Sequence, residues 1–231
     1  MLYGSDNNTT TTCTGGSPQF YIGGMGFGTS PNESACGGAS AFQASAATAA
    51  GKSNTFGYWW LMGPTQDPDY NVTTSEAYAW GQKQAVAAVN ARNTTTYSSL
   101  VGRNTIFADI ETYVPSPCVG IVSEYMGWLL GQTSQDYGLN QAVWNGFKAQ
   151  VWSYSGNKFP AGVYCSPSNW SVLMNDLSLS GVSVWTSEVC CQSSCPSTMS
   201  GSQNFGGGNL YIWQFSDATG PDYDAAETLP S

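Results

Sequence analysis

The chain has 231 residues, 41% of them hydrophobic and 13% aromatic, which is enough to bury a substantial core and too apolar for a disordered chain. Six Lys and Arg residues stand against fifteen Asp and Glu residues, for a formal net charge of −9. So few basic residues argue against binding to nucleic acid or to an anionic membrane surface. Histidine is absent, which excludes Ser-His-Asp and Cys-His catalysis and histidine-ligated zinc. Any catalysis must therefore use carboxylates.

Short β-rich apolar runs alternate with helical stretches, a pattern that favours a parallel α/β fold over an all-β sandwich. Seven runs predict strands, at Leu2–Ser5, Phe20–Met25, Phe56–Met62, Thr105–Ile110, Ala161–Cys165, Val182–Trp185 and Leu210–Phe215. An eighth strand is either the weaker segment Tyr223–Ala225 or missing. The order of elements predicts a single-domain TIM-type (β/α) barrel over residues 1–231, with seven or eight strands.

Helical periodicity is clearest in three segments, Ser75–Arg92 with Ser75 as its cap, Asn140–Tyr154 and Glu124–Leu130. Polar segments at residues 7–17 and 192–209 are expected to be loops over the open end of the barrel. No apolar run approaches the roughly 20 residues that cross a bilayer, so membrane insertion is not expected.

Cysteine is frequent for a cytosolic enzyme of this length, at positions Cys13, Cys36, Cys118, Cys165, Cys190, Cys191 and Cys195. This number favours an oxidising compartment and hence a secreted or cell-surface protein. Because seven is odd, one thiol is free or pairs with another chain, which leaves self-association open. The last three cysteines form one cluster without a second ligand pair, so we expect neither a metal site nor a cofactor.

The segment Asn104–Tyr113 contains the most informative motif, an apolar run that ends in two carboxylates, Asp109 and Glu111. Residues two apart in a strand share a face, so Asp109 and Glu111 should point the same way as Phe107. The intervening residues, Ile106, Ala108 and Ile110, should face the helices. The sequence thus predicts a pair of acids at the mouth of the barrel.

The carboxyl ends of barrel strands are where active sites of this fold are built. Cleavage of a glycosidic bond needs one protonated carboxyl group to donate to the leaving oxygen and one charged carboxylate as nucleophile, base or electrostatic stabiliser. Asp109 and Glu111 fit those two roles. The alternative interpretation is that both are solvated residues at a strand end, or that Glu111 caps a following helix.

The order of motifs along nearly the whole chain resembles the glycoside hydrolase family 25 muramidases, and more closely a related glycoside-hydrolase-like family, the domain of unknown function 1906. The segments that carry the resemblance are Tyr3–Asp6, Phe20–Gly24, Gly57–Pro64, Gly81–Ala85, Asp109–Tyr113, Gly162–Ser166, Trp185–Ser187, Trp213–Phe215 and Asp222–Asp224. Two segments depart from the family pattern, because Asn7 and its neighbours follow the first motif and Trp185–Ser187 stands where Trp-x-Ala is usual.

The resemblance implies that Glu111 is the general acid and Asp109 its charged partner. It further implies that Asp6 and Asp224 complete an acidic ring, with Asp222 as a competitor for the last position. Family 25 enzymes cleave the β-1,4 bond after N-acetylmuramic acid in peptidoglycan. The implied partner of this chain is therefore a cell-wall glycan.

Aromatic residues cluster near the ends of the predicted strands, where flat rings can stack on sugars. We select Trp59, Tyr113, Tyr164 and Trp185 as substrate-binding residues, together with Gln214, which points into the site if Trp213 packs outward. The alternative is that these rings fill the barrel core.

Two hypotheses about function follow from these observations. The first is a secreted muramidase-like glycoside hydrolase that uses Glu111 and Asp109. The second is a non-catalytic extracellular protein on the same barrel, which binds carbohydrate or builds a surface filament. Release of product from purified peptidoglycan separates the two hypotheses.

Overall fold

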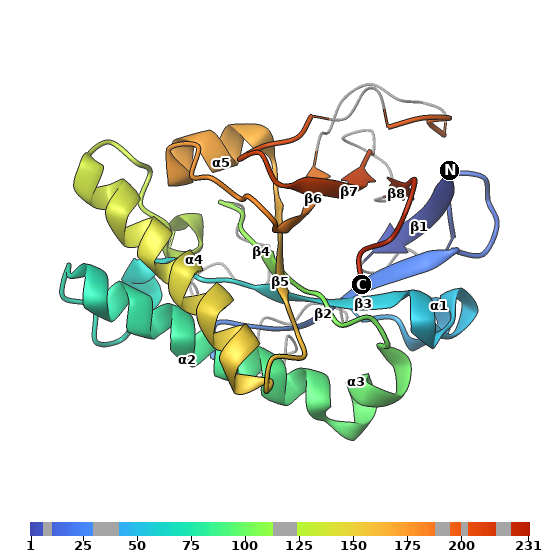
Figure 1. Ribbon diagram of the computed structural model, residues 1–231, viewed down its shortest axis with the longest axis horizontal. Helices are drawn as coiled ribbons and strands as arrows, with labels where there is room; N and C mark the ends of the chain where they lie inside the picture. The colour runs from blue at the N-terminus through green and yellow to red at the C-terminus, as the bar shows by residue number, and fades with distance from the viewer. Residues whose placement is uncertain (7–10, 30–41, 113–123, 188–194, 200–202, 216–222) are drawn as a thin grey trace.

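The computed structural model describes residues 1–6, 11–29, 42–112, 124–187, 195–199, 203–215 and 223–231. Within these residues, eight strands close into one barrel in the order of the sequence (Figure 1). The strands are β1 (Leu2–Asp6), β2 (Phe20–Phe27), β3 (Thr55–Trp60), β4 (Ile106–Asp109), β5 (Ala161–Cys165), β6 (Ser183–Ser187), β7 (Asn209–Gln214) and β8 (Tyr223–Ala226). The predicted TIM-like barrel is confirmed, and the weak segment at Tyr223 supplies its eighth strand.

Side chains along the strands alternate between two apolar layers. Phe107, Tyr164 and Ile212 pack together with other strand residues inside the barrel. Their chain neighbours Ala108 and Val163 pack instead among the residues of the helices. This period of two is a property of extended backbone, and it confirms the two faces predicted for the fourth strand.

The last strand differs in direction from the others. Strands β1 to β7 pair in parallel, whereas β8 runs antiparallel to both β7 and β1. Only residues 215–222 lie between β7 and β8, and a parallel return needs a connection of a dozen or more residues. Because β8 is reversed, its amino end lies at the barrel edge where the other strands have their carboxyl ends.

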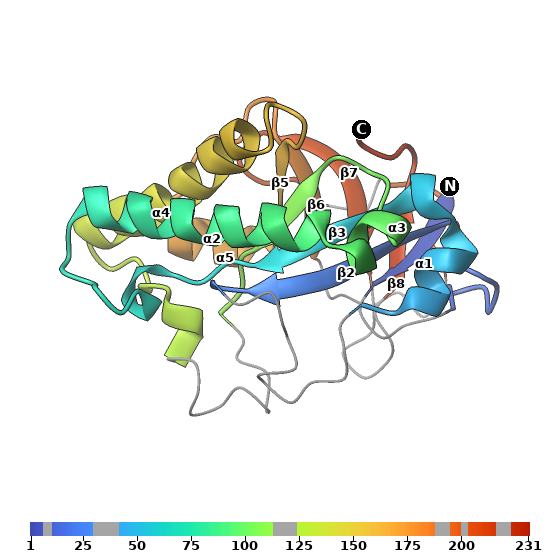
Figure 2. The same ribbon diagram turned by 90° about the horizontal axis from the view of Figure 1, so that it is seen from below.

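Two long helices, α2 (Thr74–Asn93) and α4 (Ser134–Tyr154), pack against each other and cover the same part of the barrel (Figures 1 and 2). Three short helices, α1 (Ala44–Ala50), α3 (Thr95–Leu100) and α5 (Pro167–Met174), were not predicted from the sequence. The cap of α2 is Thr73 rather than Ser75, because the Thr73 hydroxyl accepts the backbone N–H of Glu76. A capping box between Thr133 and Asp136 starts α4 six residues before the predicted position.

The helix predicted at Glu124–Leu130 is wrong. Only one 3-10 turn, Glu124–Gly127, is present, and Tyr125 and Met126 both have a left-handed φ of 57°. Tertiary contacts hold this conformation, since the backbone N–H of Gly63 donates to the Met126 carbonyl at 2.9 Å. The hydroxyl of Thr65 donates to the next carbonyl, that of Gly127, at 3.0 Å. Contacts with a distant turn therefore override the local helical pattern.

Glycines allow α2 and α4 to approach closely. A Cβ added to Gly81 on α2 would lie 2.0 Å from the Val143 carbonyl oxygen on α4. A Cβ added to Gly146 on α4 would lie 2.1 Å from the Tyr78 carbonyl oxygen on α2. Both contacts involve helix backbone, which cannot move aside as a flexible side chain can.

We therefore expect Gly146→Ala to lower the free energy of unfolding by about 1 to 3 kcal/mol, the usual cost of overpacking. The matched control is Gly138→Ala on the same helix, where the added methyl group would meet its nearest atom, Thr74 Cγ2, at 3.9 Å. That substitution should stabilise the protein by about 0.5 to 1 kcal/mol, because glycine costs entropy within a helix. Urea unfolding followed by circular dichroism measures both changes, and equal stability of the two variants would contradict the contact.

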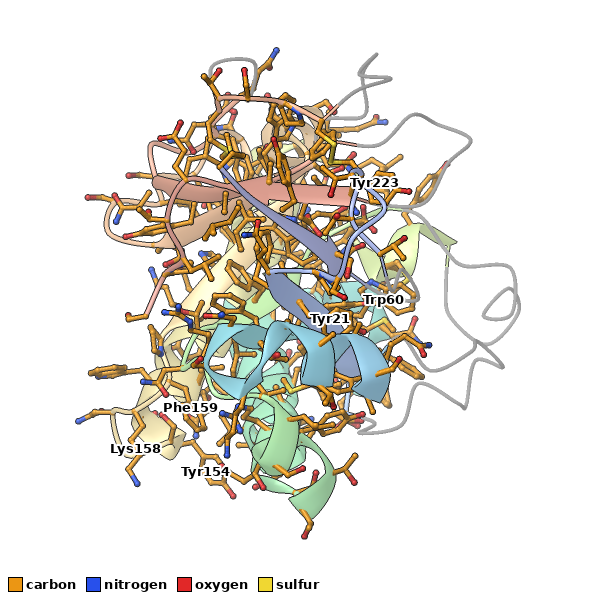
Figure 3. All side chains as sticks on the ribbon, turned by 90° about the vertical axis from the view of Figure 1, so that its right-hand side faces the viewer. Tyr21, Trp60, Tyr154, Lys158, Phe159 and Tyr223 are labelled. Carbon is orange, nitrogen blue, oxygen red and sulfur yellow. A yellow bond between two sulfur atoms is a disulfide. The ribbon has the colours of Figure 1, made fainter. Side chains whose placement is uncertain are left out.

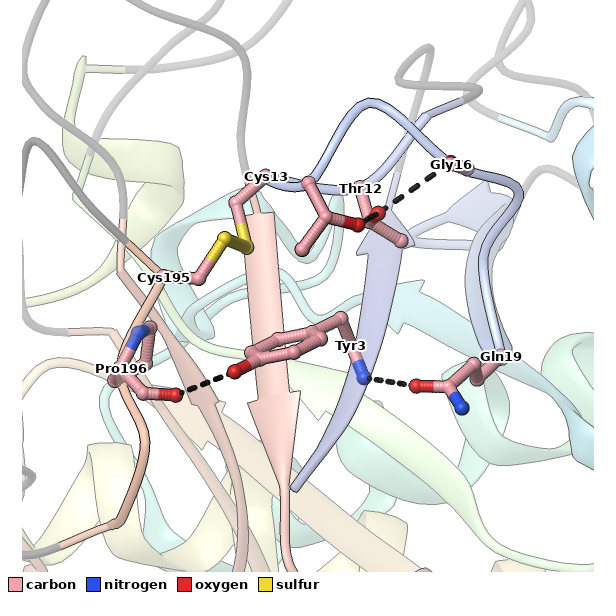
Figure 4. The surroundings of a disulfide bond; sticks show 8 residues. Tyr3, Thr12, Cys13, Gly16, Gln19, Cys195 and Pro196 are labelled. Carbon is pink, nitrogen blue, oxygen red and sulfur yellow. Dashed lines mark hydrogen bonds between the residues drawn. A yellow bond between two sulfur atoms is a disulfide. The ribbon is translucent and has the colours of Figure 1, made fainter.

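The outer face of β7 and β8 is covered differently from the rest of the barrel. Trp213, Phe215 and Ala225 form a small apolar cluster there, with Tyr3 and Cys13 packed against it. The disulfide between Cys13 and Cys195 joins the segment after β1 to the segment before β7, and the predicted oxidised cysteines are thus present (Figure 4). The hydroxyl of Tyr3 donates to the Pro196 carbonyl at 2.9 Å beside this bridge (Figure 4). The disulfide thus holds together the loop segments that cover this cluster, a position that none of the described helices occupies.

The carboxyl-terminal residues lie at the amino end of β4. The hydroxyl of Thr105, which precedes β4, donates to the Ser231 carbonyl at 2.7 Å. The Arg103 guanidinium donates to the Pro230 carbonyl at 3.0 Å and lies over the Phe56 ring. None of the helices in the described residues combines the length and apolar composition needed to cross a bilayer.

Candidate active site

Three polar side chains stand at the carboxyl ends of barrel strands. Asp6 is the last residue of β1, Asp109 the last residue of β4 and Gln214 the last residue of β7. Their exposed fractions are only 3%, 5% and 5%. Because parallel strands present their carboxyl ends at one edge of a barrel, the fold gathers these groups at the place where barrel active sites form.

Glu111 follows Asp109 by two residues, beyond the end of β4. The backbone N–H of Ile110 donates to the Tyr164 carbonyl at 3.0 Å, so the alignment with β5 extends past the end of β4. The side chain of Ile110 packs into the helix-facing core. Glu111 itself is half-buried. Ile110 thus faces the helices as predicted, and the shared direction of the two acids stays a prediction.

The pKa of the Tyr164 hydroxyl is affected by three of the predicted acids. Burial raises the pKa of its hydroxyl well above 10.0, and the charges of Glu111, Asp109 and Asp6 raise it further, while a hydrogen bond with Ser187 opposes them. Three predicted acids from two strands and the residues after them therefore act on one phenol. The Tyr164 hydroxyl stays protonated at neutral pH and serves as a hydrogen-bond donor.

Asp224, the fourth predicted acid, reaches the same edge because β8 is reversed. It is aligned with Gln214 of β7 on one side and with Gly4 of β1 on the other. Its side chain is fully buried, and the indole N–H of Trp185 donates to its Oδ1 at 2.9 Å. Asp224 is thus the most enclosed of the four acids.

The amide of Gln214 connects two of these strands. Its Nε2 donates to Asp6 Oδ2 at 2.9 Å, and its Oε1 accepts a hydrogen bond from the Tyr164 hydroxyl. Trp213 packs into the outer cluster, which is the condition under which the sequence predicts an inward Gln214. The side chain of Gln214 therefore lies within the site and contacts an acid directly.

Two predicted substrate-binding aromatics are wrong as sugar-stacking surfaces. Trp59 points to the helix side of the sheet, where its indole N–H donates to the Gly28 carbonyl at 3.0 Å and its ring is fully buried. Trp185 points into the barrel but is buried against the ring of Tyr164, with the ring centroids 4.2 Å apart. Its contact with Asp224 makes it a support for an acid. Tyr113 and Asp222 lie outside the described residues.

Two residues that were not selected from the sequence lie in the site. Trp60, the last residue of β3, is half-buried, is aligned with Asp109 and packs against the barrel interior. In Figure 3 Trp60 and Tyr223 lie toward one end of the barrel, and Lys158 and Phe159 toward the other. Ser187, the last residue of β6, hydrogen-bonds to Tyr164. Strand alternation from Tyr58 and Trp185 could have identified both residues.

Cys165, next to Tyr164, faces away from the site. It packs in the helix-facing core as a buried free thiol. Burial raises its pKa well above 9.0, and the charges of Glu111 and Asp109 add to the effect. The thiol therefore stays protonated at neutral pH and is not a nucleophile. Within the described ranges, no three His, Cys, Asp or Glu side chains are grouped as metal ligands.

The chemistry available at this edge is that of carboxyl groups, a protonated phenol and an amide. A half-buried carboxyl group among other carboxylates can hold a proton for a leaving oxygen, while a neighbour in a polar contact stays charged. The described part of the chain is thus a closed (β/α) barrel with acids at the edge where the active sites of such barrels form.

Solved structures with a similar fold include lysozymes and muramidases. The family 25 lysozyme from Aspergillus fumigatus aligns over 99% of this chain and 94% of its own, with 17% identity and a TM-score of 0.59. The muramidase from Acremonium alcalophilum aligns over the same shares, with 15% identity and a TM-score of 0.59. The muramidase from Trichobolus zukalii aligns over 99% and 95%, with 16% identity and a TM-score of 0.56.

At the level of sequence, no protein-family model and no curated protein matches the chain. The similarity to the three solved structures therefore establishes the fold, and the resemblance to family 25 stays a prediction. The narrower resemblance to the domain of unknown function 1906 stays a prediction.

Proposed function

We propose that this protein is a secreted glycoside hydrolase that cleaves the glycan of peptidoglycan, with Glu111 as general acid and Asp109 as its charged partner. The observation that carries the proposal is the position of Asp6 and Asp109 at the carboxyl ends of β1 and β4, with Glu111 two residues beyond Asp109. Acids gathered in one place resist simultaneous ionisation, which favours a protonated carboxyl group among them.

Glu111 is the better proton donor of the pair. It lies beyond the end of β4 and is half-buried, whereas Asp109 is 5% exposed. A donor must reach the glycosidic oxygen, and the more exposed carboxyl group is the one that a polymer can approach. Asp109 then supplies the negative charge that stabilises an oxocarbenium-like transition state.

The substrate assignment draws on the fold and on the polar character of the site. The solved structures that share the fold are described as muramidases and as a lysozyme. Trp60, half-buried beside Asp109, offers an indole for a sugar face, and carboxylates can accept hydrogen bonds from sugar hydroxyls.

The disulfide supports an extracellular location. Cys13 and Cys195 are joined although 182 residues separate them in the sequence. Such bonds persist in oxidising compartments and are rare in a reducing cytosol. The buried Cys165 is unsuited to pairing with a second chain.

The test is incubation of the disulfide-bonded protein with purified peptidoglycan from several bacteria. We expect release of new reducing ends, and mass spectrometry of the fragments should place N-acetylmuramic acid at those ends. Chitin, which has the same linkage without the lactyl group, is the control glycan and should be cleaved more slowly. No fragment release from any wall type would contradict the proposal, and binding without release would favour the non-catalytic alternative.

A further inference from the structure

We propose that Gln214 and Tyr164 are positioning residues that hold Asp6 in its charged form, so that Asp6 acts as a fixed negative charge and leaves proton donation to Glu111. This inference rests on the proposed glycosidase function. The observation behind it is a directional chain of hydrogen bonds across the barrel, from Ser187 through Tyr164 and Gln214 to Asp6.

The direction of the chain follows from the groups that form it. The Tyr164 hydroxyl donates to Gln214 Oε1, which occupies the acceptor end of the amide. The donor end, Nε2, then faces Asp6 Oδ2 at 2.9 Å. A reversed amide would place two acceptors against each other unless Asp6 carried a proton. The observed order therefore favours a charged Asp6.

The Tyr164 hydroxyl keeps Gln214 in this orientation across the pH range in which the enzyme would work. Burial, followed by the charges of Glu111, Asp109 and Asp6, raises the pKa of Tyr164 well above its ordinary 10.0. The hydroxyl thus always has a proton to give to Gln214. Ser187 from β6 hydrogen-bonds to the same hydroxyl and completes its surroundings.

The basic residues of the chain lie outside the eight strands of the barrel. The six Lys and Arg residues lie on helices or in the segments that lead into strands at their amino ends, at Lys52, Lys83, Arg92, Arg103, Lys148 and Lys158. The carboxyl groups at this edge are Asp224 on β8 and Asp109 and Glu111 at β4. The other ionisable groups on β1, β2, β5, β7 and β8 are tyrosine hydroxyls and the Cys165 thiol, with the tyrosines at Tyr3, Tyr21, Tyr164, Tyr211 and Tyr223. All of them are acidic, so a donated amide hydrogen bond is the kind of interaction that keeps a carboxylate ionised here.

The charge on Asp6 has a consequence for Glu111. The charges of both groups raise the pKa of the Tyr164 hydroxyl, and Asp6 is buried while Glu111 is half-buried. A negative charge nearby disfavours ionisation of a second carboxyl group. A charged Asp6 therefore helps Glu111 to keep the proton that the reaction needs. Gln214 thereby influences proton transfer by Glu111 without contacting the glycosidic oxygen itself.

The test compares Gln214→Leu with Gln84→Leu. Gln84 is also a fully buried glutamine, but it lies on α2 and bonds only to the backbone of Met62 in the contacts described. We expect Gln214→Leu to lower kcat about 10- to 100-fold with KM close to the wild-type value. The bell-shaped pH profile of kcat should narrow from both sides, because Asp6 gains a proton at higher pH and Glu111 loses one at lower pH. Gln84→Leu should lose stability but keep the wild-type profile.

A second variant keeps the proposal testable if Gln214→Leu does not fold. Tyr164→Phe keeps the ring that packs on Trp185 and removes the hydroxyl, and with it both the donor to Gln214 and the hydrogen bond with Ser187. It should narrow the pH profile in the same sense but less. An unchanged profile in both variants would overturn the proposal, because loss of stability alone does not move the limbs of such a profile.

A readout without activity separates this proposal from the proposed function. Carboxyl carbon NMR of protein labelled at aspartate, with the Asp6 signal assigned from Asp6→Asn, follows protonation of Asp6 directly. The midpoint of that titration should rise by about one pH unit or more in Gln214→Leu. If the midpoint rises in Gln214→Leu and the wild type cleaves no glycan, the positioning role stands and the hydrolase function fails. An unchanged midpoint overturns the positioning role whatever the activity.

Discussion

Replacement of Glu111 by glutamine is expected to lower the rate of peptidoglycan cleavage by about 10²- to 10⁴-fold, the contribution that a general acid usually makes. Glutamine keeps the size of the side chain but cannot deliver a proton to the leaving oxygen. Because the residue is half-buried beyond the end of β4, the fold should be unaffected. Initial rates of reducing-end release at the pH optimum measure the change.

The matched control is Glu227→Gln, which changes an exposed glutamate beyond β8. Its Oε1 accepts the backbone N–H of Met199, and glutamine can preserve that contact. The control should retain wild-type activity. If Glu111→Gln cleaves peptidoglycan as fast as the control does, Glu111 is not the acid.

Removal of the disulfide should have the largest effect on stability. The bond between Cys13 and Cys195 closes a loop across 182 residues of sequence. Long loops lose the most entropy on closure in the unfolded chain, and loss of such a bond typically costs about 2 to 5 kcal/mol. We therefore expect Cys13→Ser with Cys195→Ser to lower the free energy of unfolding by that amount in urea titrations.

Unfolding with and without a reducing agent separates the effect of the Cys13–Cys195 disulfide from any effect of the other cysteines. Wild type and double variant are unfolded with and without a reducing agent, and the reductant should move the wild type toward the variant. It should have a smaller effect on the variant itself. If the double variant unfolds at the wild-type midpoint, the cover over Trp213 and Phe215 does not depend on the cross-link.

Strand positions and the acidic motif could be predicted from sequence because both follow from local periodicity. In the run from Ile106 to Asp109, apolar residues that face the helices alternate with residues of mixed character that face the barrel interior. This alternation is read directly from the sequence, because successive side chains in extended backbone point to opposite faces. The same rule places Gln214 inward and Trp213 outward. Residue pairs that meet across the barrel, such as Gln214 with Asp6, have no such local signal.

The wrong predictions have a physical cause in tertiary contacts. The run Tyr58, Trp59 and Trp60 is aromatic on both faces, so its composition does not reveal which rings point inward. Residues 124–130 have apolar spacing typical of a helix, but their left-handed backbone depends on a turn far away in sequence. The hydrogen bond that makes Trp185 a support for Asp224 depends on the reversed direction of β8.

The position of the last residues has a practical use. Because Ser231 and Pro230 are bonded beside the amino end of β4, a linker attached after Ser231 would leave the molecule on the side away from Asp109. Protein immobilised on a bead or a sensor chip through such a linker would present its acids outward to an insoluble polymer. Attachment at this terminus is therefore the suitable format for surface-based binding measurements on intact cell walls.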